Sequence, residues 1–438
     1  MEVYTKKLIH LWDVDVIVVG SGTAGASAAI SAARKGANTV LVERFGFLGG
    51  TSTQVLDTFY GYYTPGNVAY KVVGGIPDDV VAELNQYNAA FERPNTFGAG
   101  TGITYDPLVL QIVWEKLALD AGVKLLYHSF CTDVIMEGNR ISGVIVDGKR
   151  GLMKITAPVV IDATGDADVC HQAGAPYERA GDIDPAQTLT TTFRMIHVDV
   201  ERAKEFGKKA MWAKMEEAAA SGNYELPRRE GSWHITTQAG VIHTIMTRIA
   251  DVDGTDPVAL TGAEIEGRKQ ALEYARFLHD LVPGYEQAAL SWLNPSIGVR
   301  ETRRVYGRYR LTRDDCLSAR KFEDAIGACG APIEDHSPGT DTTWIYLPDG
   351  MTYDIPYRTL LPKEVDGLLV AGRCFSATHD AHASCRSMAQ TMTMGQAAGA
   401  AAAMAIKNEM HPHEISVTAL QDDLRLMGAK FGEILAKA

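Results

Sequence analysis

Several features that would indicate particular protein classes are missing from this chain of 438 residues. No run of about 18 apolar residues occurs, and the alanine-rich run at 397–406 is too short, so the sequence predicts no transmembrane helix. The six cysteines are scattered, and no Cys-x-x-Cys pair occurs. This spacing argues against a disulfide framework, a zinc ribbon and a redox-active dithiol. Internal repeats and low-complexity segments are also missing.

Positive charge is scarce as well. There are 42 Lys and Arg residues against 54 Asp and Glu residues, which gives a net charge of −12. Because nonspecific binding to nucleic acids and to anionic membranes depends on Lys and Arg, we expect neither as a partner. Asp13 and Asp15 interrupt the apolar residues near the N-terminus, so the sequence predicts no signal peptide. We therefore expect a cytoplasmic protein.

What the sequence does contain is a clear pattern between Asp13 and Arg44. Residues 16–19 are a β-branched run that predicts a buried parallel strand. A glycine-rich turn and an alanine-rich helix follow, and Gly36 should end this helix. A second strand at 39–42 leads directly to Glu43. This order of elements is typical of the dinucleotide-binding βαβ unit.

Each glycine of the turn has a physical role in such a unit. Gly20 permits the tight turn, Gly22 lets the backbone approach a pyrophosphate, and Gly25 lets the helix pack against the strand. The free N–H groups and the dipole of the helix start then face the phosphates. Glu43 follows Gly20 by 23 residues, close to the spacing of about 20 for the acid that accepts hydrogen bonds from ribose hydroxyls.

The rest of the chain continues the α/β pattern. Ligands bind at the carboxyl ends of parallel strands, where the sequence places Thr164, Gly165, Asp166, Gly372 and Arg373. Further helices are predicted at 106–121, 200–221, 261–281, 387–406 and 416–426, and strands at 123–127, 131–136, 140–146, 157–162, 188–198 and 368–370. We predict a nucleotide-binding domain from 1–186, 297–330 and 362–438, an inserted α+β cap or substrate domain at 187–296, and a cap-associated segment at 331–361.

The chain resembles the FAD-dependent oxidoreductase family related to the fumarate reductase and succinate dehydrogenase flavoproteins, with the glutathione-reductase-type FAD fold. The matching motifs run in family order along nearly the whole chain, at 17–26, 48–51, 161–166, 298–304, 355–358, 369–373 and 395–399. The resemblance implies FAD as the cofactor. It also implies a Rossmann-like FAD-binding domain, in which a parallel sheet with helices is accompanied by a β-meander.

The same resemblance implies which residues contact FAD. They are Gly20, Gly22, Thr23 and Ala24 at the pyrophosphate; Glu43 and Arg44 at the adenosine ribose; Val134 at the adenine; Thr164, Gly165, Asp166, Gly372 and Arg373 at the phosphates and ribityl chain; Gly49, Gly50 and Thr51 at the isoalloxazine; and Gly395, Gln396 and Ala397 in a late helix. The N–H groups and positive dipole end of that helix would face the N1–C2=O edge of the flavin. That edge becomes negative on reduction, so the contact would stabilise reduced flavin.

Candidate catalytic residues lie at 376–386, between the last predicted strand and the late helix. His379, which we favour, or His382 would act as general acid or base, and Arg386 would hold an anionic substrate. The alternatives are structural histidines, covalent flavin attachment, or a metal at His379 and His382. No metal is expected, because no third ligand suggests itself. In the basic stretch 298–310 we predict internal salt bridges between cap and core, with an anion site or a flavin contact as the alternative; the residues are Arg300, Glu301, Arg303 and Arg304.

A second dinucleotide motif and a redox cysteine pair are both missing from the sequence. We therefore predict an FAD-dependent oxidoreductase that transfers hydride or electrons between a small organic substrate and flavin N5, in either direction. An FAD-dependent tRNA-modifying flavoprotein is one alternative, which the acidic charge disfavours. A non-catalytic FAD-binding subunit is the other. The sequence leaves open whether the protein forms a homo-oligomer.

Overall fold

The computed structural model describes residues 5–432 except 68, 338 and 349. Five parallel strands form its central sheet, in the order β22 (Leu368–Val370), β11 (Val159–Asp162), β2 (Val16–Val19), β3 (Thr39–Val42) and β7 (Lys124–Leu126). Helix α1 (Thr23–Arg34) connects β2 to β3, and Gly36, at φ +92°, follows its end. The βαβ unit predicted from the sequence is confirmed.

The two faces of the central sheet are covered differently, which explains why its strands are apolar throughout. Val16 and Val18 pack with α1 and with α11 (Met388–Lys407) in one core. Ile17 and Val19 pack in a second core against a four-stranded sheet. That sheet has the order β1 (Ile9–Asp13), β10 (Gly151–Thr156), β9 (Arg140–Gly148) and β8 (Phe130–Glu137). The predicted hairpin is β8–β9; β10 extends it to a meander, and β1 joins in parallel.

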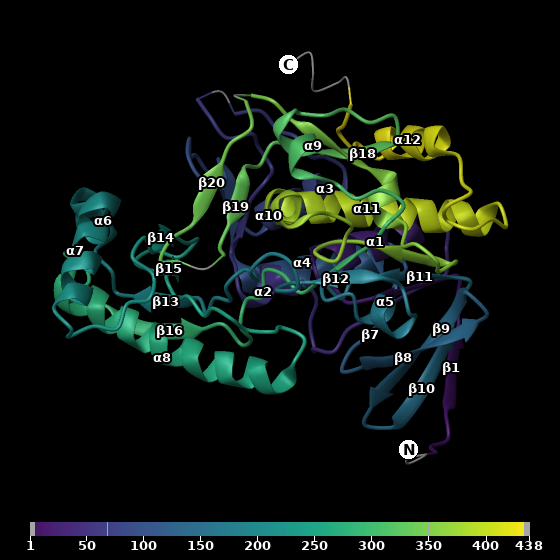
Figure 1. Cartoon of the computed structure of the whole chain (residues 1–438), viewed down its shortest axis with the longest axis horizontal. Coiled ribbons are helices and arrows are strands. Elements are labelled where there is room, and N and C mark those ends of the chain that lie inside the picture. The colour runs from purple at the N-terminus through teal and green to yellow at the C-terminus, as the bar shows by residue number, and fades with distance from the viewer. Residues whose placement is uncertain (1–4, 68, 338, 349, 433–438) are drawn as a thin grey trace.

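A further antiparallel sheet lies within residues 187–296. It consists of β14 (Ser232–Ile235), β15 (Ile242–Ile245), β13 (Phe193–Ile196) and β16 (Ala289–Leu293), accompanied by α6 (Val200–Phe206), α7 (Lys208–Ala220) and α8 (Pro257–Leu281). These elements share a core of their own and lie to the left of the central sheet in Figure 1. We call them the cap. The domain limits drawn from the sequence stay a prediction.

Two predicted cap elements differ from the structure. The helix expected at 200–221 is divided, because Gly207 adopts φ +80° between α6 and α7. The strand expected at 188–198 is regular only in β13, since Leu189 and Thr190 form isolated bridges to Ile249 and Gly298 instead.

The remaining elements connect the cap to the core or cover the core. They are α2 (Thr51–Gln54), β4 (Thr58–Phe59), α3 (Ile76–Gln86), β5 (Ala90–Arg93), β6 (Gly102–Tyr105), α4 (Pro107–Asp120), α5 (Asp168–Gln172), β12 (Tyr177–Arg179), β17 (Arg303–Val305), α9 (Arg313–Leu317), β18 (Ala325–Cys329), β19 (Ile333–Asp335), β20 (Thr343–Ile345), β21 (Tyr353–Pro356), α10 (His379–Cys385) and α12 (Val417–Leu426). Across the described ranges, no helix is both long and apolar enough to cross a membrane.

Helices α1 and α11 touch backbone to backbone. A Cβ atom built on Gly395 would lie 2.0 Å from the carbonyl oxygen of Ala24, so only glycine permits this contact. The hydroxyl of Ser31 also donates to the carbonyl oxygen of Gln396, at 2.7 Å. Gly395 therefore fixes how closely the two helices approach.

We expect Gly395→Ala to lower the free energy of unfolding by about 1–3 kcal/mol, because the added methyl must push α1 away from α11. The matched control is Gly262→Ala in α8, where a Cβ would meet no atom within 4 Å. That exposed change should stabilise the protein by about 0.5–1 kcal/mol. Urea denaturation of both variants measures the difference. Equal effects on stability would contradict the close-contact role of Gly395.

Candidate active site

A cavity of about 820 Å³ extends from the carboxyl edge of the central sheet to the cap. Its volume lies within the roughly 300–1,000 Å³ typical of ligand pockets. Gly20, Glu43 and Thr164, which follow β2, β3 and β11, line one end. Trp233 and Arg228 of the cap line the other. The cavity therefore joins the nucleotide-binding edge to the cap.

The end of the cavity at the sheet is shaped for an anion. Gly22 precedes α1, whose first turn contains no acidic residue and is capped by no side chain. A Cβ on Gly22 would meet no protein atom within 4 Å, so this side of the turn is open. Beside it, the carboxylate of Glu43 accepts hydrogen bonds from the backbone N–H groups of Ser21 and Phe45, both at 2.9 Å. An open helix start of this kind binds phosphate groups.

Most predicted FAD contacts lie along this cavity. Its lining includes Gly20, Gly22, Thr23, Ala24, Glu43, Arg44, Gly50, Thr51, Thr164, Gly165, Asp166, Gly372 and Arg373. Gly49 lies just behind the lining, where its N–H donates to the carbonyl of Ser21 at 2.8 Å. Arg373 is held by Asp166 at 2.7 Å. The motifs thus come together from distant parts of the chain.

Two groups of residues predicted to contact FAD do not line the cavity. Gly395, Gln396 and Ala397 are buried inside α11, about two turns beyond its start. The uncapped first turn at Ser387 and Met388 lines the cavity instead. Glycine is needed in α11 for packing on α1, and its position therefore did not indicate the helix start.

Val134 was predicted beside the adenine, but it lies in the middle of β8. Its N–H donates to the side chain of Asp133 at 2.8 Å, and its side chain packs in the core below the sheet. Phe130 and Cys131, at the beginning of β8, line the cavity.

His379, the favoured catalytic candidate, does not line the cavity. Its Nδ1 lies 3.1 Å from Glu301 Oε1, and its Nε2 lies 3.2 Å from Asp335 Oδ1. Burial alone would lower the pKa of His379, but these carboxylates raise it to about 10. Both ring nitrogens are therefore engaged with carboxylates that favour the protonated ring, an environment that does not suit a general base.

His382 does not line the cavity either. It is fully buried, donates from Nε2 to the carbonyl oxygen of Arg373 at 2.8 Å, and stacks on Phe375. Burial lowers its pKa well below the ordinary value. Of the three predicted catalytic residues, only Arg386 lines the cavity.

Sequence reasoning missed several polar residues at the cap end of the cavity. Glu334 and His336 belong to the segment that begins with β19, and their side chains are bonded at 2.9 Å. Burial and the neighbouring Arg300 lower the pKa of His336 to about 3, so its ring is neutral. Arg228 of the cap lines the same end of the cavity, which we call the chamber. No local motif marks these residues, because they meet only in the fold.

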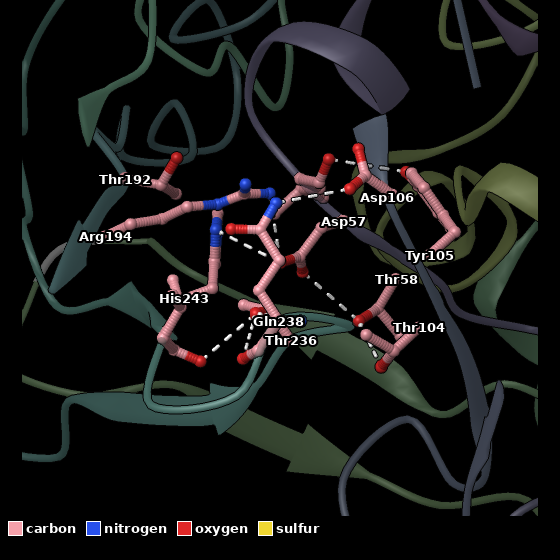
Figure 2. A network of polar contacts seen from close by, with 12 residues as sticks. Asp57, Thr58, Thr104, Tyr105, Asp106, Thr192, Arg194, Thr236, Gln238 and His243 are labelled. Atoms are coloured by element: carbon pink, nitrogen blue, oxygen red, sulfur yellow. Dashed lines mark hydrogen bonds and ion pairs between the residues drawn. The ribbon is translucent and has the colours of Figure 1, made fainter. Parts of the chain in front are cut away.

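A buried network holds the cap beside this chamber (Figure 2). Asp57, just before β4, lies 2.6 Å from His234 on β14 and 3.5 Å from Arg194 on β13. His243 on β15 lies 3.4 Å away. Burial alone would raise the pKa of Asp57, but the nearby His243, His234 and Arg194 hold it well below its usual range. The ionised carboxylate therefore connects the core to three cap strands.

Comparison with known proteins identifies the family to which the chain belongs. The family model described as FAD dependent oxidoreductase matches residues 15–424. The chain belongs to this family. It is accordingly an enzyme, an FAD-dependent oxidoreductase, and bound FAD supplies redox chemistry toward an organic substrate. The open starts of α1 and α11 and the unfilled space at Gly22 fit such a cofactor.

Individual proteins are also similar to this chain. Thiamine thiazole synthase of Methanococcus maripaludis strain C6 is 29% identical over 230 residues, which cover 50% of this chain and 75% of that protein. Thiamine thiazole synthase of Pyrobaculum calidifontis is 31% identical over 193 residues, covering 40% and 66%. The crystal structure of p-nitrophenol 4-monooxygenase PnpA from Pseudomonas putida DLL-E4 shares the fold, with a TM-score of 0.50, 12% identity, and coverage of 94% and 84%.

His379 should make stability depend on pH. Its folded pKa of about 10 lies above the ordinary value of 6.5, so its contribution is fully present below about pH 6.5 and is lost as the pH rises to 10. We expect His379→Gln to cost about 3–5 kcal/mol near pH 6, because two buried carboxylates lose their cation. The difference from the unmodified protein should shrink toward pH 10. Denaturation curves at several pH values measure it, and a pH-independent difference would contradict the assignment.

Proposed function

We propose that the cap encloses a small organic substrate at the cap end of the cavity, where the substrate meets the flavin of FAD directly. The continuity of the cavity carries this proposal, since one space joins Gly22 at the sheet to Arg386 and Arg228 under the cap. With no second dinucleotide motif in the sequence, the substrate itself is the partner in electron transfer.

We assign the FAD contacts to the predicted residues that line the cavity, with two changes. Phe130 and Cys131 take the place of Val134, and Ser387 and Met388 take the place of the three residues at 395–397. The uncapped starts of α1 and α11 support this assignment, because each places positive charge where the cofactor carries or gains negative charge.

For proton transfer we propose the pair of Glu334 and His336 rather than His379. Both side chains line the cavity. Burial and Arg300 lower the pKa of His336 to about 3, so the ring takes a proton only when an anionic substrate neutralises Arg300 and raises that pKa. Burial alone would raise the pKa of Glu334, but His336, Arg386 and Arg300 lower it to about 2. The carboxylate therefore keeps the imidazole oriented.

We further infer a relationship to the glutathione-reductase-type flavoproteins that include fumarate reductase. The βαβ unit, the meander beside it and the late helix packed on α1 support this relationship. We also propose a cytoplasmic location, which the six free cysteines support. The acidic net charge disfavours the tRNA-modifying alternative.

Gly22→Val tests the cofactor site. At φ −56° and ψ 179° valine fits the backbone without strain, and no protein atom opposes its side chain. We therefore expect an unchanged urea midpoint for the FAD-free protein and at least a tenfold weaker affinity for FAD. The unmodified protein should bind FAD with a flavin spectrum that bleaches reversibly on reduction. Equal FAD affinity in the two proteins, or no FAD binding by either, would overturn the proposal.

A further inference from the structure

Four arginines converge on the cap end of the cavity, namely Arg93, Arg228, Arg300 and Arg386. Each is buried or half-buried. Among the residues that the structure describes, none of the four forms an ion pair with a carboxylate. This is unusual, because buried charges are normally paired.

Neutral groups hold these arginines in place. Arg300 donates from Nη1 to the carbonyl oxygen of Thr188 at 2.6 Å and to the hydroxyl of Thr190 at 2.7 Å. Arg228, only 7% exposed, donates to the carbonyl oxygen of Ile245 at 3.2 Å and to the hydroxyl of Thr342 at 3.3 Å. These bonds fix the guanidinium groups without neutralising them.

Arg386 follows the same pattern. It donates to the side-chain oxygen of Gln187 at 2.9 Å and to the backbone carbonyl of Glu334 at 3.3 Å. The buried Nε atoms of Arg228 and Arg386 have no hydrogen-bond partner in the described chain. Burial lowers the pKa of Arg300, and Arg386 and Arg228 lower it further. The neutral partners and the unpaired Nε atoms indicate that these arginines bind a negatively charged ligand.

The other arginines of the basic stretch behave differently. Arg303 pairs with Asp168 at 2.9 Å, and Arg304 pairs with Glu301 at 3.1 Å and with Glu178. Both arginines thus form internal salt bridges, but their partners lie outside the cap, so these pairs are not the predicted salt bridges between cap and core. Arg300, unlike Arg303 and Arg304, lines the cavity and has no acidic partner among the described residues.

The charge of the chamber defines its ligand further. Among the described residues that are buried or half-buried at the cap end of the cavity, Glu334 supplies one negative charge. The four arginines supply four positive charges, so the chamber has an excess of three positive charges. The walls between the arginines carry Tyr60, Trp212 and Trp233. These rings suit the apolar body of an organic molecule better than a hydrated inorganic ion.

We propose that the substrate is an organic anion with at least two acidic groups, carboxylate or phosphate, bound by Arg228, Arg300 and Arg386. This inference rests on the proposed function, since it names the substrate class of the same chamber. Arginine suits the role, because its planar fork binds carboxylate and phosphate oxygens in pairs.

The test uses the FAD-loaded protein, so that the nucleotide end is filled. Succinate, ethane-1,2-diphosphonate and acetate are titrated at constant ionic strength set with chloride, and the unfolding temperature and the flavin absorption are recorded. We expect one of the two dianions to raise the unfolding temperature and to shift the flavin spectrum, with acetate at least tenfold weaker. Whichever dianion binds more tightly shows whether the site prefers carboxylate or phosphate groups.

Arg228→Gln and Arg300→Gln should each weaken binding of that dianion at least tenfold, and Arg386→Gln serves if either fails to fold. The matched control is Arg229→Gln, because Arg229 pairs with Glu216 at 2.9 Å and does not line the cavity. Equal weakening by the control, or no response to any dianion in a protein that binds and cycles FAD, would overturn the inference while the proposed function stands.

If the protein binds no FAD, the proposed function fails separately. Calorimetric titration of the FAD-free protein with the same anions then still tests the arginines. If the dianion binds and Arg228→Gln abolishes this binding, the result supports the anion site formed by the arginines. If no dianion binds, the anion site is refuted.

Discussion

The contact between α1 and α11 is the constraint on which the rest of the site depends. Gly395 lies against the backbone of Ala24, and the hydroxyls of Thr23 and Thr391 meet at 2.7 Å. Because the helices touch here, both uncapped starts open onto one cavity. Two positive helix ends on one space suit a ligand with negative charge at two places, as a dinucleotide flavin has when reduced.

Buried charge has two distinct roles in this protein. Neutralised charges hold the architecture: Asp57 connects the core to the cap strands, and His379 lies between Glu301 and Asp335. Charges without an acidic partner lie on the cavity, with Arg228 and Arg300 held by neutral oxygens. A buried charge that stays unpaired costs stability, so its placement is expected where a ligand pairs with it. This distinction separates structural from functional residues more sharply than residue type does.

The sequence predicted those parts of the site whose determinants are local. Gly20, Gly22 and Glu43 lie within one βαβ unit, so their spacing was sufficient. The surroundings of His379 could not be predicted, because its partners Glu301 and Asp335 lie far away along the chain. Arg300 and Arg304 look alike in sequence, but in the fold Arg304 pairs with Glu301 and with the distant Glu178, whereas Arg300 has no acidic partner among the described residues. Residues near Gly395 were misplaced because a glycine needed for packing resembles one that marks a turn.

A crystal structure of the FAD-bound protein tests the central claim most directly. The account predicts the diphosphate at the start of α1 beside Gly22 and the flavin ring at the start of α11 beside Ser387, with Arg386 on the substrate side. A diphosphate far from Gly22, or a flavin ring remote from Ser387 and Met388, would contradict it.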